Sequence, residues 1–125
     1  MTHETVSALM AVWTGTPADL LRAALESLRE QSRTPDETVV VVDGPLSREH
    51  ELVLAGFADI ERVNLPANVG LGRALAAGLD RCTGEWVARA DADDVNLPER
   101  LEVQLKVLKL AGADLCAASM REVTG

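Results

Sequence analysis

Three carboxylates lie within four residues in the segment Asp91-Ala92-Asp93-Asp94. Carboxylates this close repel one another unless a cation or an ordered set of hydrogen bonds compensates their charge. Hard cations such as Mg²⁺ and Mn²⁺ take oxygen ligands, usually one or two carboxylates, and complete their shell with phosphate oxygens and water. In an extended segment, Asp91 and Asp93 point the same way and reach one ligand. The alternative is a solvated acidic loop in which Asp94 or Asn96 caps the next helix.

Two further polar motifs could bind a ligand. Asp43 follows four valines and precedes Gly-Pro, so its carboxylate could accept hydrogen bonds from a nucleobase or ribose, or could cap a turn. The segment Asn68-Val69-Gly70-Leu71-Gly72 resembles a glycine-rich phosphate loop at a helix start, where free N–H groups favour anions. It lacks the third glycine of GxGxxG, so a dinucleotide-binding fingerprint is not supported. We interpret the next residue, Arg73, as a surface arginine.

The elements that must position these residues alternate between β-rich runs and helical patterns. The uninterrupted β-branched run before Asp43 is typical of a strand buried on both faces of a parallel sheet. Thr16 is predicted to cap the first helix, with Pro17 in its first turn. Strands are predicted over residues 6–13, 38–43, 60–65, 86–90 and 115–120. The first helix is predicted to start at residues 16–17. Further helices are predicted over residues 47–57 and 71–81, and the last from residues 97–99 to Gly112.

This order, βαβαβαβαβ, predicts an α/β fold: a Rossmann-like, three-layer αβα domain with a mainly parallel sheet. We expect residues 1–125 to form a single domain, because domains commonly hold about 100 to 150 residues. In open parallel sheets, ligands bind beyond the carboxyl ends of the strands. The ends of the first four predicted strands should therefore meet at one edge. Trp13 either forms a wall of a base pocket there or packs against the sheet.

Composition excludes several classes of function. The chain has 125 residues and a formal net charge of −8, so a phosphate backbone or an anionic lipid surface would repel it, and we expect no nucleic-acid partner. No apolar run approaches the roughly 20 residues that span a bilayer, and no secretory signal is visible. Cys82 and Cys116 are interpreted as thiols in a reducing compartment. These features predict a cytoplasmic location, compatible with peripheral association at the inner membrane face in the full-length protein.

Taken together in this order, the motifs resemble those of family 2 glycosyltransferases of the GT-A fold. The resemblance runs nearly end to end. Its most specific part is Ala90-Asp91-Ala92-Asp93-Asp94 followed by Leu97-Pro98-Glu99-Arg100-Leu101. The other matching segments are residues 9–13, 25–32, 41–45, 68–72 and 84–86.

The resemblance implies an enzyme that transfers a sugar from a nucleoside diphosphate to an acceptor hydroxyl, with inversion. By family analogy Trp13 and Asp43 hold the nucleobase, and Asp91 contacts the ribose or the donor sugar. Asp93 binds the divalent metal, Mn²⁺ or Mg²⁺, that neutralises charge on the leaving nucleoside diphosphate. The implied nucleotide-sugar-binding residues are Ala11, Trp13, Asp43, Asn68, Gly70, Asp91 and Ala92, with Asp93 as the metal ligand.

The resemblance also bears on partners. It favours a UDP-sugar as donor and implies a saccharide or lipid-linked acceptor in the full enzyme. His3 and His50 lie in a terminal segment and a polar helix start, so neither is a candidate catalytic base. We therefore expect this chain to be the N-terminal, nucleotide-binding part of a longer glycosyltransferase, or a naturally short relative that is inactive alone. Apolar surface left exposed on such a half-domain predicts a homodimer.

Two other functions fit an acidic α/β domain. A nucleotidyltransferase that makes nucleotide sugars also uses a metal and an α/β sheet, but it would carry a longer glycine-rich loop with a basic residue directly after the first strand. The segment Trp13-Thr14-Gly15-Thr16 has no such residue. A non-catalytic, receiver-like signalling module would need a phosphorylatable aspartate after the third strand and a lysine after the fifth, and both positions lack them.

Overall fold

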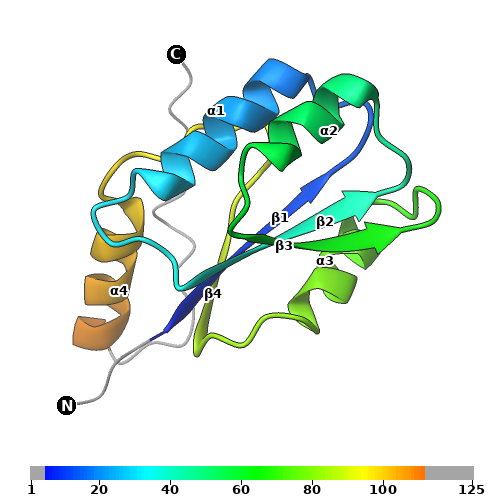
Figure 1. The fold of residues 1–125 in the computed structure, drawn as a ribbon. Helices are drawn as coiled ribbons and strands as arrows, with labels where there is room; N and C mark the ends of the chain where they lie inside the picture. The colour runs from blue at the N-terminus through cyan, green and yellow to red at the C-terminus, as the bar shows by residue number, and fades with distance from the viewer. Residues whose placement is uncertain (1–4, 112–125) are drawn as a thin grey trace.

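The computed structural model describes residues 5–111, which form one four-stranded parallel sheet with helices on both faces (Figure 1). The sheet order is β3-β2-β1-β4, and the elements follow one another as βαβαβαβα. The predicted α/β, Rossmann-like fold is therefore confirmed. The strands are β1 (Val6–Val12), β2 (Glu37–Asp43), β3 (Ile60–Leu65) and β4 (Trp86–Arg89); the helices are α1 (Ala18–Arg29), α2 (Arg48–Ala55), α3 (Leu71–Leu79) and α4 (Arg100–Ala111).

The valine run of β2 forms the centre of the sheet and separates two apolar clusters. Val40 and Val42 belong to the larger cluster, under α1 and α2, whereas Val39 and Val41 belong to the smaller cluster, which contacts α3. All four valines are buried, as the sequence predicted for a strand covered on both faces. Because side chains alternate between the two faces along β2, this one strand contributes apolar residues to the helix layers on both sides of the sheet.

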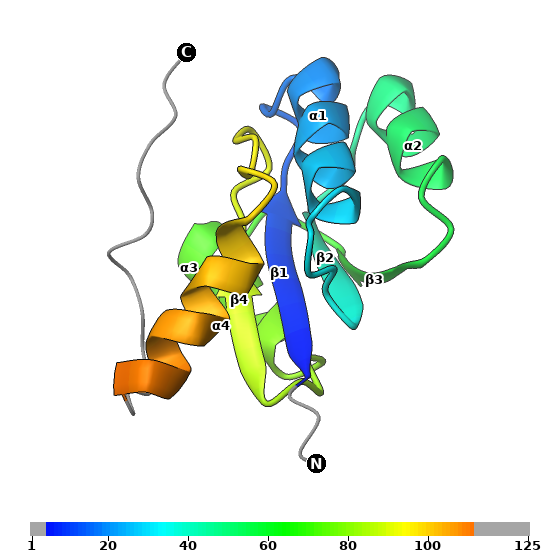
Figure 2. The same ribbon diagram turned by 90° about the vertical axis from the view of Figure 1, so that its left-hand side faces the viewer.

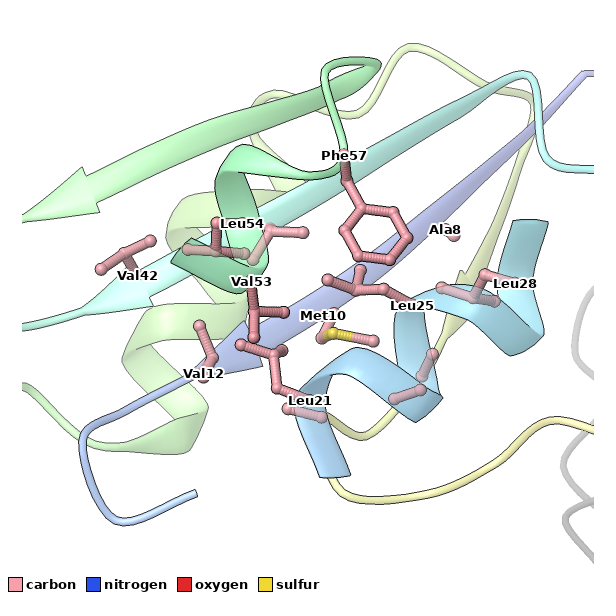
Figure 3. Packing of buried hydrophobic residues seen from close by; sticks show 14 residues of the cluster. Ala8, Met10, Val12, Leu21, Leu25, Leu28, Val42, Val53, Leu54 and Phe57 are labelled. Atoms are coloured by element: carbon pink, nitrogen blue, oxygen red, sulfur yellow. The ribbon is translucent and has the colours of Figure 1, made fainter. Parts of the chain in front are cut away.

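The larger cluster fixes α1 and α2 over the sheet (Figure 3). Met10 of β1 and Leu21 of α1 are fully buried there, and Phe57 closes the cluster beyond α2. Ala90 and Ala92, which flank Asp91, belong to the same cluster. The acidic segment is therefore attached to the core through its small residues, while its carboxylates stay outside.

The structure corrects the start of the first helix. The sequence predicted Thr16 as its cap, but Pro17 holds the N-cap position, and no side chain makes a cap hydrogen bond. Thr16 instead closes a turn, because its N–H donates to the Trp13 carbonyl over 3.0 Å. The carbonyl of Thr16 lies 2.5 Å from Nε2 of the buried His50, so α2 holds this turn in place.

Several other boundaries also differ from the predicted ones: β1 ends at Val12, β2 begins at Glu37, α2 ends at Ala55 and β4 ends at Arg89. α3 ends at Leu79, two residues early, because the N–H groups of Arg81 and Cys82 bond three residues back and tighten the last turn. α2 begins at Arg48 with Ser47 as its N-cap, and α4 begins only at Arg100. The predicted strand 115–120, the helix end at Gly112, His3 and Cys116 lie outside the described residues. Within residues 5–111, no helix is long and apolar enough to cross a bilayer.

Candidate functional site

Strand register brings the predicted polar segments to one edge of the sheet. Val12 pairs with Val42, and Asp43 pairs with Leu65, so β1, β2 and β3 end at nearly the same level. β4 ends lower, because its last residue, Arg89, pairs with Leu9 of β1. The chain that follows β4 therefore runs beside the carboxyl end of β1, where it appears as the yellow segment in Figure 2.

A cavity of about 460 Å³ opens at this edge and takes residues from the ends of β1, β2 and β4 and from the loop after β3. All eight residues predicted from the sequence line it: Ala11, Trp13, Asp43, Asn68, Gly70, Asp91, Ala92 and Asp93. Four further lining residues, which sequence reasoning missed, are Val12, Thr16, Leu71 and Arg89. Of these, Arg89 had a usable signal: it lies near the end of the predicted strand 86–90, two residues before Asp91, at the edge where ligands bind.

The acidic segment is a turn and not the extended strand continuation that we expected. The N–H of Asp94 donates to the carbonyl of Asp91 over 3.2 Å, which closes the turn. Pairing with β1 stops at Ala90, and aspartate is well suited to turns, so nothing holds the segment extended. Ala92 is buried against the core, and Asp93 is exposed. Asp91 and Asp93 thus reach one cavity by flanking a turn.

Two arginines balance the charge of Asp91. Arg89 Nη2 lies 3.4 Å from Asp91 Oδ1, in an ion pair open to water, which contributes little to stability. Arg100 approaches from α4: burial lowers the pKa of its guanidinium, and the charge of Asp91 acts in the opposite direction. Arg89 therefore places an exposed cationic donor in the cavity, whereas Arg100 is held by α4 at the ends of the turn.

The donor set at the turn fits a divalent cation that arrives with a phosphate. Among residues 5–111 there is no group of three or more Asp, Glu, His or Cys residues placed to hold a metal ion. The cavity offers the carboxylates of Asp91 and Asp93. One or two carboxylates, completed by water and phosphate oxygens, is the usual environment of Mg²⁺ in nucleotide sites. The residues therefore suit a cation shared with a ligand and do not form a complete cage.

Asp43 holds the glycine-containing loop after β3. Its carboxylate is buried and accepts hydrogen bonds from the N–H of Val69 (2.8 Å), the N–H of Gly70 (3.2 Å) and Nδ2 of Asn68 (3.3 Å). Two of the N–H groups that the sequence suggested for an anion are thus already occupied by a carboxylate of the chain. Gly70 has a φ of 95°, a conformation that favours glycine, at the N-cap of α3.

Trp13 lies half exposed at the mouth of the cavity, folded over Gly15 of the same turn. A methyl group at Gly15 would lie 2.1 Å from Cζ2 of the indole, so there is no room for a side chain beneath the ring. Gly15 does not have a positive φ. The glycine is therefore needed here for the close approach of the indole and not for its backbone conformation.

Gly15→Ala should displace the Trp13 indole with little change in the free energy of unfolding. The ring can move into solvent, because Trp13 is already half exposed. The measurement is Trp13 fluorescence in a Trp86→Phe background, together with the free energy of unfolding from chemical denaturation. Gly72→Ala is the matched control, because a Cβ at Gly72 meets nothing within 4 Å. Unchanged fluorescence in Gly15→Ala would show that the indole does not depend on Gly15.

An open parallel sheet with a polar cavity beyond its strand ends is the architecture of Rossmann-like nucleotide-binding domains. Comparison with known proteins makes the assignment more specific. The chain belongs to glycosyl transferase family 2, whose sequence model matches residues 7–125. Membership of this family favours sugar transfer over the nucleotidyltransferase and receiver-like alternatives.

Curated relatives support the same family. The chain is 42% identical over 106 residues to the amylovoran biosynthesis glycosyltransferase AmsE of Erwinia amylovora, covering 82% of this chain and 40% of that protein. It is 34% identical over 109 residues to the UDP-Gal:alpha-D-GlcNAc-diphosphoundecaprenol beta-1,3-galactosyltransferase of Escherichia coli, covering 85% and 40%. The chain thus spans about 40% of the length of these relatives.

Solved structures share the fold. S. aureus TarS residues 1–349 in complex with UDP superposes with a TM-score of 0.73 at 21% identity, covering 85% of this chain and 32% of that one. The mannosyltransferase PcManGT from Pyrobaculum calidifontis, in complex with GDP-Man and Mn²⁺, gives a TM-score of 0.71 at 22% identity, covering 86% and 33%. At these identities, the likeness establishes the fold.

Proposed function

We propose that this chain is the donor-binding part of an inverting glycosyltransferase, and that it binds a nucleoside diphosphate sugar together with Mn²⁺ or Mg²⁺. The observation that carries the proposal is the cavity at the carboxyl edge. It is lined by an aromatic ring after β1, a fixed polar loop after β3 and two carboxylates of the turn after β4. A nucleotide needs a surface for its base, and its diphosphate needs charge compensation. The cavity of an acidic protein can supply that compensation only through a cation or an arginine.

Each lining residue has a task in this proposal. Trp13 forms one wall for the nucleobase, and Asp43 shapes the opposite side by fixing Asn68 and Gly70. Asp93, exposed at the tip of the turn, supplies the carboxylate for the cation. Asp91 faces the ribose or the donor sugar.

Arg89 adds a role that sequence reasoning did not provide. Its guanidinium lines the cavity beside Asp91 and can donate to an oxygen of the diphosphate. The bound cation would neutralise negative charge on the leaving nucleoside diphosphate. Arg89 would strengthen the same stabilisation from the protein side, because its charge is already held near Asp91 without being buried.

The acceptor site and the catalytic base are assigned to residues outside this chain. The three acids that line the cavity already have tasks: Asp43 holds a loop, and Asp91 and Asp93 face the donor and its cation. The chain spans about 40% of its curated relatives, which leaves the larger part of such a protein to provide both functions. This chain alone should therefore bind a donor without transferring its sugar.

A UDP-sugar is the favoured donor. The E. coli relative, at 34% identity, acts on UDP-Gal by its name. TarS with UDP and PcManGT with GDP-Man, at 21% and 22% identity, support the fold and do not separate the two nucleotides. A saccharide or lipid-linked acceptor is consistent with the diphosphoundecaprenol-linked acceptor in the name of the E. coli relative.

Calorimetric titration of the chain with UDP and with GDP, each in Mn²⁺ and in EDTA, tests the proposal. We expect UDP to bind in Mn²⁺ with a Kd in the micromolar range and at least about 100-fold more weakly in EDTA, since the cation carries the diphosphate. GDP should bind more weakly than UDP. Equal affinity for UDP in Mn²⁺ and EDTA would contradict the proposed role of the acidic turn.

A further inference from the structure

The acidic turn lies between two residues, Ala90 and Asn96, that hydrogen bonds hold to the rest of the fold. At its start, Ala90 is buried, and its N–H donates to the carbonyl of Leu9 over 2.9 Å. At its end, Asn96 is buried, and its backbone N–H and its Nδ2 both donate to Oγ of Ser27 in α1, over 2.9 and 3.1 Å. Residues 91–95 lie between these two residues and carry the three carboxylates.

Arg100, the first residue of α4, bridges the two ends of this segment. Its Nη2 donates to the carbonyl of Arg89 over 2.7 Å, just before the turn. Its Nη1 donates to Oδ1 of Asn96 over 2.6 Å, just after the turn. A guanidinium can make both bonds at once, because its donors form a rigid planar fork.

The start of α4, from which Arg100 extends, is itself fixed by Gln31, which follows the C-cap of α1. The buried Gln31 donates from Nε2 to the carbonyl of Leu97 over 2.6 Å, and its Oε1 accepts from the N–H of Leu101 over 3.0 Å. These bonds hold the residues on both sides of Arg100 without involving the turn. The guanidinium therefore connects a rigid helix start to both ends of a short loop.

We propose that Arg100 is a positioning residue that ties the ends of the acidic turn together, and thereby keeps Asp91 and Asp93 ready for the cation and the diphosphate. This inference rests on the proposed function of the same cavity. Arg100 is held at the ends of the turn and is not among the residues that line the cavity, so it acts through Asp91 and Asp93. Its loss should change the cation-dependent part of binding more than the contact between the cavity and the base.

Arg100→Lys separates the bridge from the charge. Lysine keeps the positive charge near Asp91 but has a single ammonium group on a flexible stem, so it cannot reproduce the two-ended contact. Arg73→Lys is the matched control, because Arg73 is exposed on α3 and does not line the cavity. Asn96→Ala is a second test, since it removes one acceptor of the bridge while the backbone N–H at that position can still bond Ser27.

We expect the Kd for UDP in Mn²⁺ to rise about tenfold in Arg100→Lys, the lower end of what groups that support metal ligands usually contribute. The Kd in EDTA should stay within about twofold of wild type, and amide hydrogen exchange should accelerate over residues 91–95. Asn96→Ala should show the same three results, and it tests the inference independently if Arg100→Lys does not fold. Arg73→Lys should match wild type in all three measurements.

Two results would overturn the inference. One is that Arg100→Lys and Asn96→Ala both keep the wild-type hydrogen-exchange rates over residues 91–95 and the wild-type Kd for UDP in Mn²⁺. The other is an equal loss of affinity in Mn²⁺ and in EDTA, which would indicate general damage to the cavity. If the wild-type chain itself fails to bind UDP with Mn²⁺, the proposed function is wrong. In that case the exchange rates over residues 91–95 still decide whether Arg100 holds the turn.

Discussion

Asp93→Asn should weaken binding of UDP in Mn²⁺ by about 100-fold, equivalent to about 2.7 kcal/mol, and leave binding in EDTA unchanged. The substitution keeps the size of the side chain but removes the anionic oxygen that a hard cation prefers. Because Asp93 is exposed at the tip of the turn, the free energy of unfolding should change by less than about 0.5 kcal/mol. Calorimetry in both buffers and thermal unfolding measure the two quantities.

Asp94→Asn is the matched control for this prediction. It removes the same charge from the adjacent residue, which is exposed but does not line the cavity. We expect its affinity for UDP in Mn²⁺ to stay within about threefold of wild type, the change that a nearby screened charge can produce. If both variants lose affinity equally, the effect comes from net charge, and Asp93 has no specific role as a ligand.

Asp43→Ala should lower the free energy of unfolding by about 3 kcal/mol and the melting temperature by about 10 °C. The carboxylate is buried and accepts from two backbone N–H groups and one side-chain amide, all in the loop that precedes α3. Hydrogen bonds to a charged acceptor are worth about 1.5 to 3 kcal/mol each, and water at the cavity edge can replace part of them. Chemical denaturation monitored by circular dichroism gives the value.

Asp80→Ala provides the comparison for Asp43→Ala. Asp80 is exposed at the C-cap of α3, so its removal should change the free energy of unfolding by less than about 0.5 kcal/mol. In Asp43→Ala, hydrogen exchange should also accelerate at Val69 and Gly70, whose N–H groups lose their acceptor. A variant as stable as wild type, with slow exchange at these amides, would mean that Asp43 does not hold the loop.

The sequence was most informative where the apolar pattern of a segment indicated both a strand and the faces on which that strand is buried. A run of four valines is typical of a strand buried on both faces of a parallel sheet, and that interpretation indicated which strand ends meet. The same rule placed Asp43, Asn68 and Asp91 at one edge, and the structure brings all eight predicted residues into one cavity. Order along the chain was sufficient for this result, because parallel strands align their ends.

Side-chain partners distant in the chain were not predictable. The contact between Asp43 and the N–H of Gly70 joins residues 27 apart, and the bond from Asn96 to Ser27 joins residues 69 apart. Such pairs depend on strand register and helix placement, which no local pattern encodes. The register of β4 against β1 could not be predicted either. Because Arg89 pairs with Leu9, the acidic segment and Arg89 line the same cavity as Ala11.

In the proposed function, UDP and a divalent cation bind at the carboxyl edge of the sheet, on the acidic turn. Paramagnetic broadening in the ¹⁵N–¹H spectrum of the chain, measured with Mn²⁺ and UDP against Mg²⁺ and UDP, locates the cation among the residues. We expect the broadening to centre on residues 91–94 and to extend to Trp13 and Gly70, while Glu37 and Thr83, at the opposite edge, stay sharp. Broadening centred on Glu37, or spread evenly over the acidic surface, would show that the cation does not bind at the acidic turn.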